Sequence, residues 1–201
     1  MPDRKRGVPV LKTSYNQILL GQGLLIICCI FYLIWWSLSY RPGVVVDRVQ
    51  GIRGLLLAIT ALSGIVGMIL SVHGAGSIPK QGPAVSGSTL LAVGIVLYFV
   101  LLVLTRNFMG RAVTTELALI VGWLILEVTV LQALWCGGRI GNAGFYLMLA
   151  IIAAAFVISM VLYVLYYRMP EGQAFYAAMV PLITEAVSMA LLLLVMLLSK
   201  K

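Results

Sequence analysis

Charged side chains are scarce in this chain, and acidic ones are scarcer still. Only 10% of the 201 residues are charged, with 6 acidic against 14 basic, whereas 62% are hydrophobic. A soluble globular domain usually carries about a quarter charged residues. The shortage excludes an ordinary water-soluble domain, because so many apolar side chains must face a solvent other than water, and lipid is that solvent.

Cysteine and histidine are too few and too scattered to form a disulfide framework or a zinc site. Cys28 and Cys29 are adjacent inside an apolar run, Cys136 ends another run, and His73 is the only histidine in the sequence. No CxxC pair or Cys/His ligand spacing is present. We therefore expect no bound metal.

Motifs of known catalytic sites are also missing. Nothing matches GxxxxGK[ST], HExxH or GxSxG, and Gly21-Gln22-Gly23 lacks the third glycine of a dinucleotide-binding loop. We expect no catalytic residue and no cofactor. A membrane enzyme that acts on lipid is accordingly the last of three functional hypotheses.

What the chain does contain is long apolar runs. Six of them are long enough, or nearly so, to cross a hydrocarbon core about 30 Å thick as helices. They are Gln17–Ser39, Ile52–Val72, Ser88–Thr105, Thr115–Trp135, Gly144–Tyr167 and Phe175–Leu198. The sequence predicts an all-α, polytopic integral membrane protein with six transmembrane helices, and a single membrane domain over residues 1–201.

Two patterns predict how these helices are arranged. Val-Leu-Tyr occurs at 96–98 and again at 161–163, and Leu-Ile-x-Glu occurs at 124–127 and 182–185, which favours three tandem helical hairpins. Small residues at spacings of three and four in the second run predict a tightly packed face and a central position for that helix. They are Gly54, Ala58, Ala61, Gly64 and Gly67.

Basic residues flank the apolar runs and form no stripe with interleaved aromatics, so we expect anionic lipid and not nucleic acid as their partner. An even number of spans leaves eight basic residues on the side of the termini and six on the other. This weak bias, with the cluster before the first run, favours cytoplasmic termini, and we expect the chain in the plasma membrane. The first run is longer than a usual signal-peptide core, and we expect it to be retained.

Glu127 and Glu185 are the most informative residues, because each lies near the middle of an apolar run. A charged side chain at the centre of the bilayer costs roughly 2.5–3.5 kcal/mol. No lysine or arginine lies inside any run to neutralise them. The alternatives are a bound proton, a bound cation, or two neutral carboxyls that only hold helices together.

Polar residues near Glu185 extend this candidate site. Pro181 removes a backbone hydrogen bond to Ala177 and predicts a kink in the last helix. Thr184 and Ser188 form a polar stripe beside Glu185 at helical spacing. Tyr98 and Tyr163, on the third and fifth runs, complete the predicted site for a substrate or an ion.

The leading hypothesis is therefore a small transporter or channel-like protein with proton- or cation-linked carboxylates at the midplane. The alternative is a non-catalytic membrane subunit or adaptor that binds a ligand or a protein through its small-residue faces. The expected partners are the lipid bilayer, a small solute or cation, and either a second copy of the chain or another membrane protein.

Overall fold

The computed structural model describes residues 7–41, 50–79, 85–109, 115–166 and 168–198, and most of these residues are helical with no strand among them. The helices are α1 (Gly7–Tyr40), α2 (Gln50–Ser77), α3 (Gly87–Met109), α4 (Thr115–Cys136), α5 (Asn142–Tyr166), α6 (Glu171–Ala177) and α7 (Met179–Leu198). Six segments of the described chain are long and apolar enough to span a membrane, with α6 and α7 forming one of them. The predicted class, a polytopic helical membrane protein, is confirmed.

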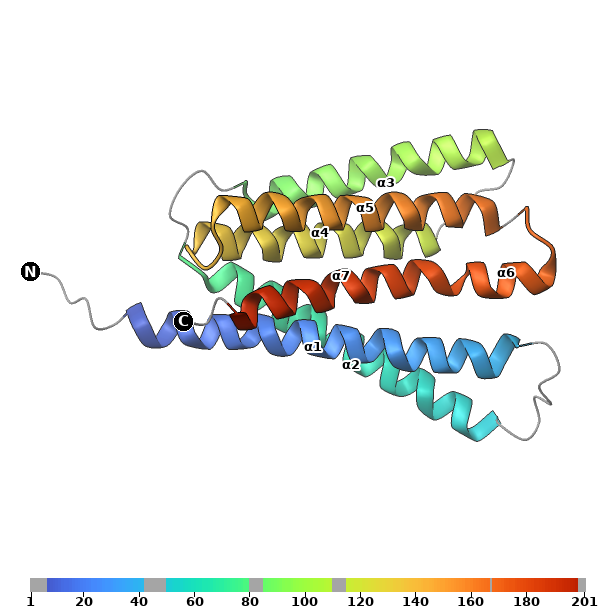
Figure 1. The fold of residues 1–201 in the computed structure, drawn as a ribbon, viewed down its shortest axis with the longest axis horizontal. Helices are drawn as coiled ribbons and strands as arrows, with labels where there is room; N and C mark the ends of the chain where they lie inside the picture. The colour runs from blue at the N-terminus through green and yellow to red at the C-terminus, as the bar shows by residue number, and fades with distance from the viewer. Residues whose placement is uncertain (1–6, 42–49, 80–84, 110–114, 167, 199–201) are drawn as a thin grey trace, which may run out of the picture.

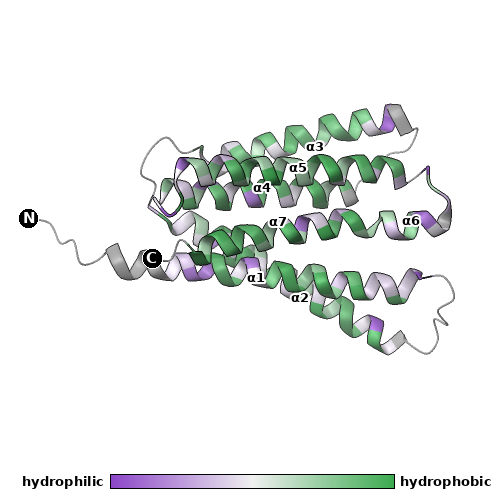
Figure 2. Ribbon diagram, viewed as in Figure 1, coloured by the Kyte–Doolittle hydropathy of each residue, from purple (hydrophilic) through white to green (hydrophobic). Residues whose placement is uncertain are grey.

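The helices run side by side along one long axis (Figure 1), and their apolar residues cover the middle of the bundle while hydrophilic residues concentrate toward its ends (Figure 2). α1 begins and α7 ends at the same end of the bundle. Successive long helices alternate in direction, and α1 with α2, α3 with α4, and α5 with α7 are in direct contact. That packing has the form of three hairpins, whereas an internal repeat stays a prediction.

Helix ends follow local chemistry. At the start of α3 the Ser86 hydroxyl accepts a hydrogen bond from the backbone N–H of Thr89 at 3.1 Å and so caps the helix. At the end of α4, Gly138 has φ of 68°. The Arg139 N–H bonds the Leu134 carbonyl, and the Gly138 N–H bonds that of Trp135. This is a Schellman ending, which needs a residue free to adopt positive φ.

The last span is interrupted at Ala178, between α6 and α7. Ala178 keeps right-handed helical angles, with φ of −67° and ψ of −22°. Because Pro181 has no N–H, it cannot bond the Ala177 carbonyl, and the regular hydrogen-bond ladder stops there. The hydrogen bond that Pro181 removes coincides with this interruption, whereas the kink itself stays a prediction.

α4 holds the centre of the bundle, because it packs against α2, α3, α5 and α7. Half of its apolar window is buried, against 28% for α2 and 6% for α3. The prediction that α2 is central is wrong. α2 packs mainly along α1, and its other main contact is with α4.

The predicted small-residue face of α2 is also wrong in its first half. Gly54, Ala58 and Ala61 are exposed, and a Cβ added at Gly54 would meet nothing within 4 Å. Each step of three residues turns the helix about 60° short of a full circle, so the steps from Ala58 to Gly67 rotate the stripe to the other side. The real contact face runs through Gly67, Ser71 and Gly74.

At that face the two backbones nearly touch. A Cβ at Gly67 would lie 2.9 Å from the carbonyl oxygen of Gly21, and one at Gly21 would lie 2.7 Å from the Ser71 nitrogen. A Cβ at Gly74 would lie 2.8 Å from the carbonyl oxygen of Ser14. Such contacts require glycine, and close backbone approach is a main source of helix association in lipid.

Candidate functional site

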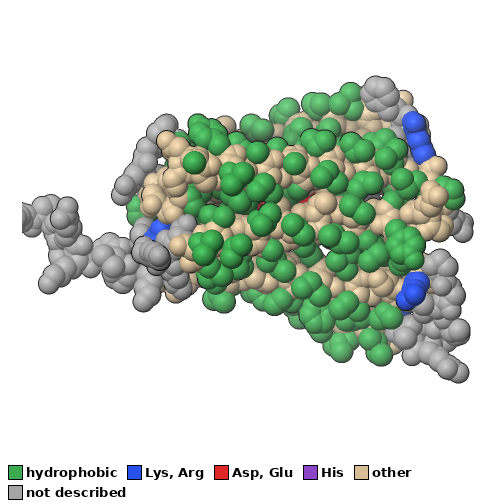
Figure 3. Space-filling view, viewed as in Figure 1, with side chains coloured by type: hydrophobic (Ala, Val, Ile, Leu, Met, Phe, Trp, Pro, Cys, Tyr) green, Lys and Arg blue, Asp and Glu red, His purple; other side chains and the backbone are tan. Residues whose placement is uncertain are grey.

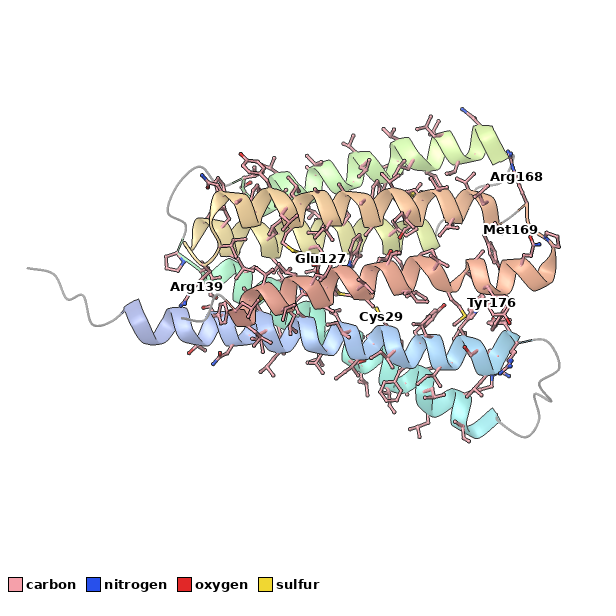
Figure 4. All side chains as sticks on the ribbon, in the orientation of Figure 1. Cys29, Glu127, Arg139, Arg168, Met169 and Tyr176 are labelled. Atoms are coloured by element: carbon pink, nitrogen blue, oxygen red, sulfur yellow. The ribbon has the colours of Figure 1, made fainter. Side chains whose placement is uncertain are left out.

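Glu127 lies on α4 in the middle of the bundle and is fully buried, with 0% of its surface exposed. Its Oε1 accepts a 2.8 Å hydrogen bond from Nε2 of Gln22, which is also 0% exposed. Gln22 belongs to α1, so this bond joins the first and fourth helices. In Figure 4, Glu127 lies between the layer of α4 and α5 and the layer of α1 and α7.

Glu185 lies on α7 and is 8% exposed. Its carboxyl has a side-chain hydrogen bond with Ser159 of α5, which is itself fully buried. The Ser159 hydroxyl is also 3.4 Å from the Thr184 hydroxyl. Glu185 therefore sits at the contact between α5 and α7, facing other helices of the bundle.

The two carboxyls belong to one interior region. They interact electrostatically with each other, and both also interact electrostatically with the thiol of Cys29, a buried residue of α1. In the space-filling view, acidic atoms show only as specks midway along the bundle, and basic side chains appear at its two ends (Figure 3). In the described part of the chain, no basic side chain has an electrostatic interaction with the Glu127 carboxyl.

Five buried side-chain atoms in the described part of the chain have no hydrogen-bond partner, and three of them belong to Gln22, Glu127 and Glu185. The five atoms are Oε1 of Gln22, Oε2 of Glu127, Oε1 of Glu185, Nε1 of Trp123 and Oγ of Ser71. Trp123 lies one turn before Glu127 on α4, on the same side of that helix. Buried polar groups are normally paired, so a cluster of unpaired ones marks a place where a proton, a water or a ligand is expected.

The structure places the other predicted site residues on three helices: Tyr98 on α3, Tyr163 on α5, and Thr184 and Ser188 on α7. The Thr184 hydroxyl donates to the Pro181 carbonyl at 2.8 Å, and the Ser188 hydroxyl donates to the Glu185 carbonyl at 2.9 Å. Tyr163 is buried on α5, and Tyr98 is half-buried on α3, where its ring meets Phe99 edge-on. Thr184 and Ser188 thus flank Glu185, whereas Tyr98 belongs to the helix that is least buried.

Sequence reasoning did not assign Gln22, Cys29, Ser159 or Trp123 to the site. Gln22 carried a usable signal, because an amide inside an apolar run needs a partner. An apolar run that begins at Gln17 leaves Gln22 close to its start. Since α1 extends back to Gly7, Gln22 is well inside the helix and reaches Glu127.

Two shallow hollows lie on the outside of the bundle and neither reaches the carboxyls. One is lined by α3 residues from Thr89 to Val100, and the other by α5 residues from Met160 to Leu165. Both linings are almost wholly apolar, as expected of surfaces that face lipid tails. Among the described residues, no group of three His, Cys, Asp or Glu side chains is placed to hold a metal ion.

No protein family, curated protein or solved structure matches this chain.

Proposed function

We propose that the protein is a small proton- or cation-linked membrane transporter or channel-like protein in which Glu127 and Glu185 are the ion-linked groups. The observation that carries this proposal is the placement of both carboxyls in one buried region with unpaired oxygens. Intramembrane carboxyls that face a bundle interior commonly belong to proton relays and ion pathways, because they are costly to keep there. Thr184 and Ser188 flank Glu185 and belong to the same proposed site.

The two carboxyls differ in access, which supports an ordered path. Glu185 is 8% exposed and lies at the contact between α5 and α7, whereas Glu127 has no exposed surface and is held by Gln22. In the proposed mechanism a proton or cation exchanges first at Glu185. The charge on Glu185 then interacts with the Glu127 carboxyl through the low-dielectric interior of the bundle.

Flux through purified protein in vesicles tests this proposal. The protein is reconstituted with a trapped pH indicator, and proton movement is followed under imposed gradients of pH, Na⁺ or K⁺. Wild type should move protons faster than protein-free vesicles, and Glu185→Gln should abolish the difference while leaving the protein folded. Glu116→Gln makes the same chemical change in the first turn of α4 and should leave flux unchanged.

Wild-type flux equal to that of empty vesicles under every gradient would overturn the proposal. The alternative function, a membrane subunit or adaptor, would then be favoured, because α3 is largely exposed at the surface of the bundle. Only 6% of its apolar window is buried, so most of its surface is open to a transmembrane helix of a partner. That alternative predicts a membrane protein that co-purifies in mild detergent and is lost when bulky residues are placed at Val96 or Val100.

We further propose that the chain resides in the plasma membrane with both termini in the cytoplasm. The orientation is supported by the excess of eight basic residues over six on the side of the termini. Cysteines introduced at Lys80 and Arg139 should react with a membrane-impermeant reagent only from the cytoplasmic side. Those introduced at Arg48 and Arg111 should react only from the outside, and labelling of two consecutive loops from one side would contradict this topology.

A further inference from the structure

The contact between Gln22 and Glu127 is half complete. One hydrogen bond, from Gln22 Nε2 to Glu127 Oε1, joins the two side chains at 2.8 Å. The remaining oxygen of each group, Oε1 of Gln22 and Oε2 of Glu127, is buried and has no partner. The two unpaired atoms therefore belong to the same pair of side chains.

An ionised carboxylate cannot complete this contact. Its two oxygens only accept hydrogen bonds, and the amide oxygen of Gln22 also only accepts. Leaving a buried polar atom unpaired costs about 1–3 kcal/mol, and more for a charged group. A single proton on Oε2 of Glu127 would give both unpaired oxygens a partner, because the resulting O–H can donate to Oε1 of Gln22.

A neutral carboxylic acid and a carboxamide are complementary planar groups. The amide N–H donates to the acid carbonyl oxygen while the acid O–H donates to the amide oxygen, so two hydrogen bonds form side by side. In this arrangement all four polar atoms that face one another in the pair have partners. The bond already present has the direction that this pairing requires.

The groups around Glu127 also favour its neutral form. It is bonded to Gln22 of α1 and interacts electrostatically with the Cys29 thiol of α1 and the Glu185 carboxyl of α7. On α4 the indole of Trp123 lies one turn away, and the Ser159 side chain that is bonded to Glu185 is a hydroxyl. None of these groups carries a positive charge, and an isolated buried carboxylate is very costly.

We propose that Gln22 and Glu127 form a proton-binding clasp, in which Glu127 is a neutral acid and its Oε2–H donates to Oε1 of Gln22. The clasp ties α1 to α4 with two hydrogen bonds. Glu185, whose own Oε1 is unpaired, is left as the carboxyl that exchanges its proton. This last assignment rests on the proposed transport function, whereas the clasp does not.

Infrared spectroscopy of the purified protein in lipid tests the clasp directly. The Glu185→Gln variant is used as background, so that Glu127 is the one glutamate left in the middle of a span. Acidic residues at the membrane surface are ionised at about pH 7 and give no carboxylic-acid band. The background should show one protonated carboxyl C=O band, which shifts in D₂O and disappears when Glu127→Gln is added.

Removal of the acceptor provides the second spectroscopic arm. Gln22→Leu in the same background should shift the band, because the acid O–H has lost its acceptor. Gln132→Leu is the matched control, since it removes another intramembrane amide, one that donates to the Val85 carbonyl, and should leave the band in place. Absence of a protonated band at about pH 7, or a band that vanishes on adding Na⁺ or K⁺, would overturn the clasp.

Thermal stability gives an independent reading. Glu127→Gln should be nearly silent, because two amides can also form a two-bond pair. Gln22→Leu and Glu127→Leu should each lower the unfolding midpoint by several degrees, since each leaves an unpaired buried group. The Gln22→Leu/Glu127→Leu double variant should recover most of the loss. Equal losses for Glu127→Gln and Glu127→Leu would contradict the pairing.

The pH dependence has a definite sign. If the folded protein holds a proton that the unfolded chain releases near neutral pH, its stability must fall as pH rises through the loss of that proton. In the Glu185→Gln background, where Glu185 cannot contribute, adding Glu127→Gln should remove this dependence. A clasp that passes these tests in a protein without flux would leave the clasp standing and the transport proposal wrong. Flux without the infrared band would show the reverse.

Discussion

The α1–α2 hairpin and the α3–α4 hairpin are built from equally apolar helices but are packed in different ways. The apolar windows have mean hydropathies of 2.4 and 2.4 in the first hairpin and 2.5 and 2.2 in the second. In the first, glycines bring backbone against backbone. In the second, the three atoms nearest to a Cβ at Gly94 all belong to the side chain of Ile125. Hydropathy therefore identifies a span but does not tell which of its neighbours are lipid and which are protein.

The difference lies in which atoms fill the contact. Backbone atoms cannot rotate away, so a contact through backbone has a single solution. A side chain such as Ile125 has rotamers, and its neighbour can move by a few tenths of an ångström. This predicts a rigid first hairpin and a more adjustable second one, and three substitutions of graded effect can test it.

Gly67→Leu should have the largest effect. The new Cβ alone would lie 2.9 Å from the carbonyl oxygen of Gly21 and 3.1 Å from the Leu25 nitrogen, so α1 and α2 must separate. We expect a loss of more than about 3 kcal/mol, because overpacking against backbone has no local relief. Thermal unfolding in detergent measures it. Rescue by Leu25→Ala would contradict the backbone explanation, since the clash with backbone atoms would remain.

Gly94→Leu should have an intermediate effect of about 1–3 kcal/mol. Here the new Cβ would lie 2.7 Å from Cγ1 and 3.1 Å from Cδ1 of Ile125, and these atoms are the ones that can be removed. The double variant Gly94→Leu/Ile125→Ala should recover most of the stability, in contrast to the first hairpin. Ala92→Leu, at an exposed position of α3, is the control and should change little.

Gly54→Leu should have the smallest effect, although Gly54 lies on the same helix as Gly67. A Cβ there would meet nothing within 4 Å, and leucine forms helices better than glycine by up to about 1 kcal/mol. The unfolding midpoint should stay unchanged or rise slightly. A large loss at Gly54, comparable to that at Gly67, would show that the whole small-residue stripe is a contact face.

The sequence predicts where these helices lie better than it predicts which helices they contact. The six spans were predictable because lipid imposes one local structure on any long apolar run, and apart from the interruption at Ala178 the observed helices contain the predicted ranges wherever the chain is described. The partners of the helices were not predictable in the same way. Gly54 and Gly67 are both glycines in the stripe of small residues on α2. Gly54 is exposed and Gly67 is buried, because the two positions lie on different sides of the helix.

For the candidate site, residue type predicted the centre but not the connections. Glu127 and Glu185 stood out because carboxyls are rare in apolar runs, and both are buried in the structure. Their hydrogen-bond partners, Gln22 and Ser159, are distant in sequence and lie on helices whose rotation hydropathy does not determine. Amides and hydroxyls inside apolar runs are common enough that single ones carry little information. The role of the site as an ion pathway stays a prediction.

The hydrogen bond from the Tyr15 hydroxyl to the Met196 carbonyl has a consequence for how the protein is made. These residues are 181 positions apart, and they join the beginning of α1 to the end of α7. The α1–α2 hairpin can assemble while the ribosome is still translating the rest. Tyr15, however, waits for its partner until the last span has emerged. This contact between α1 and α7 therefore forms only after α7 has emerged, and a chain stopped before Met196 lacks it.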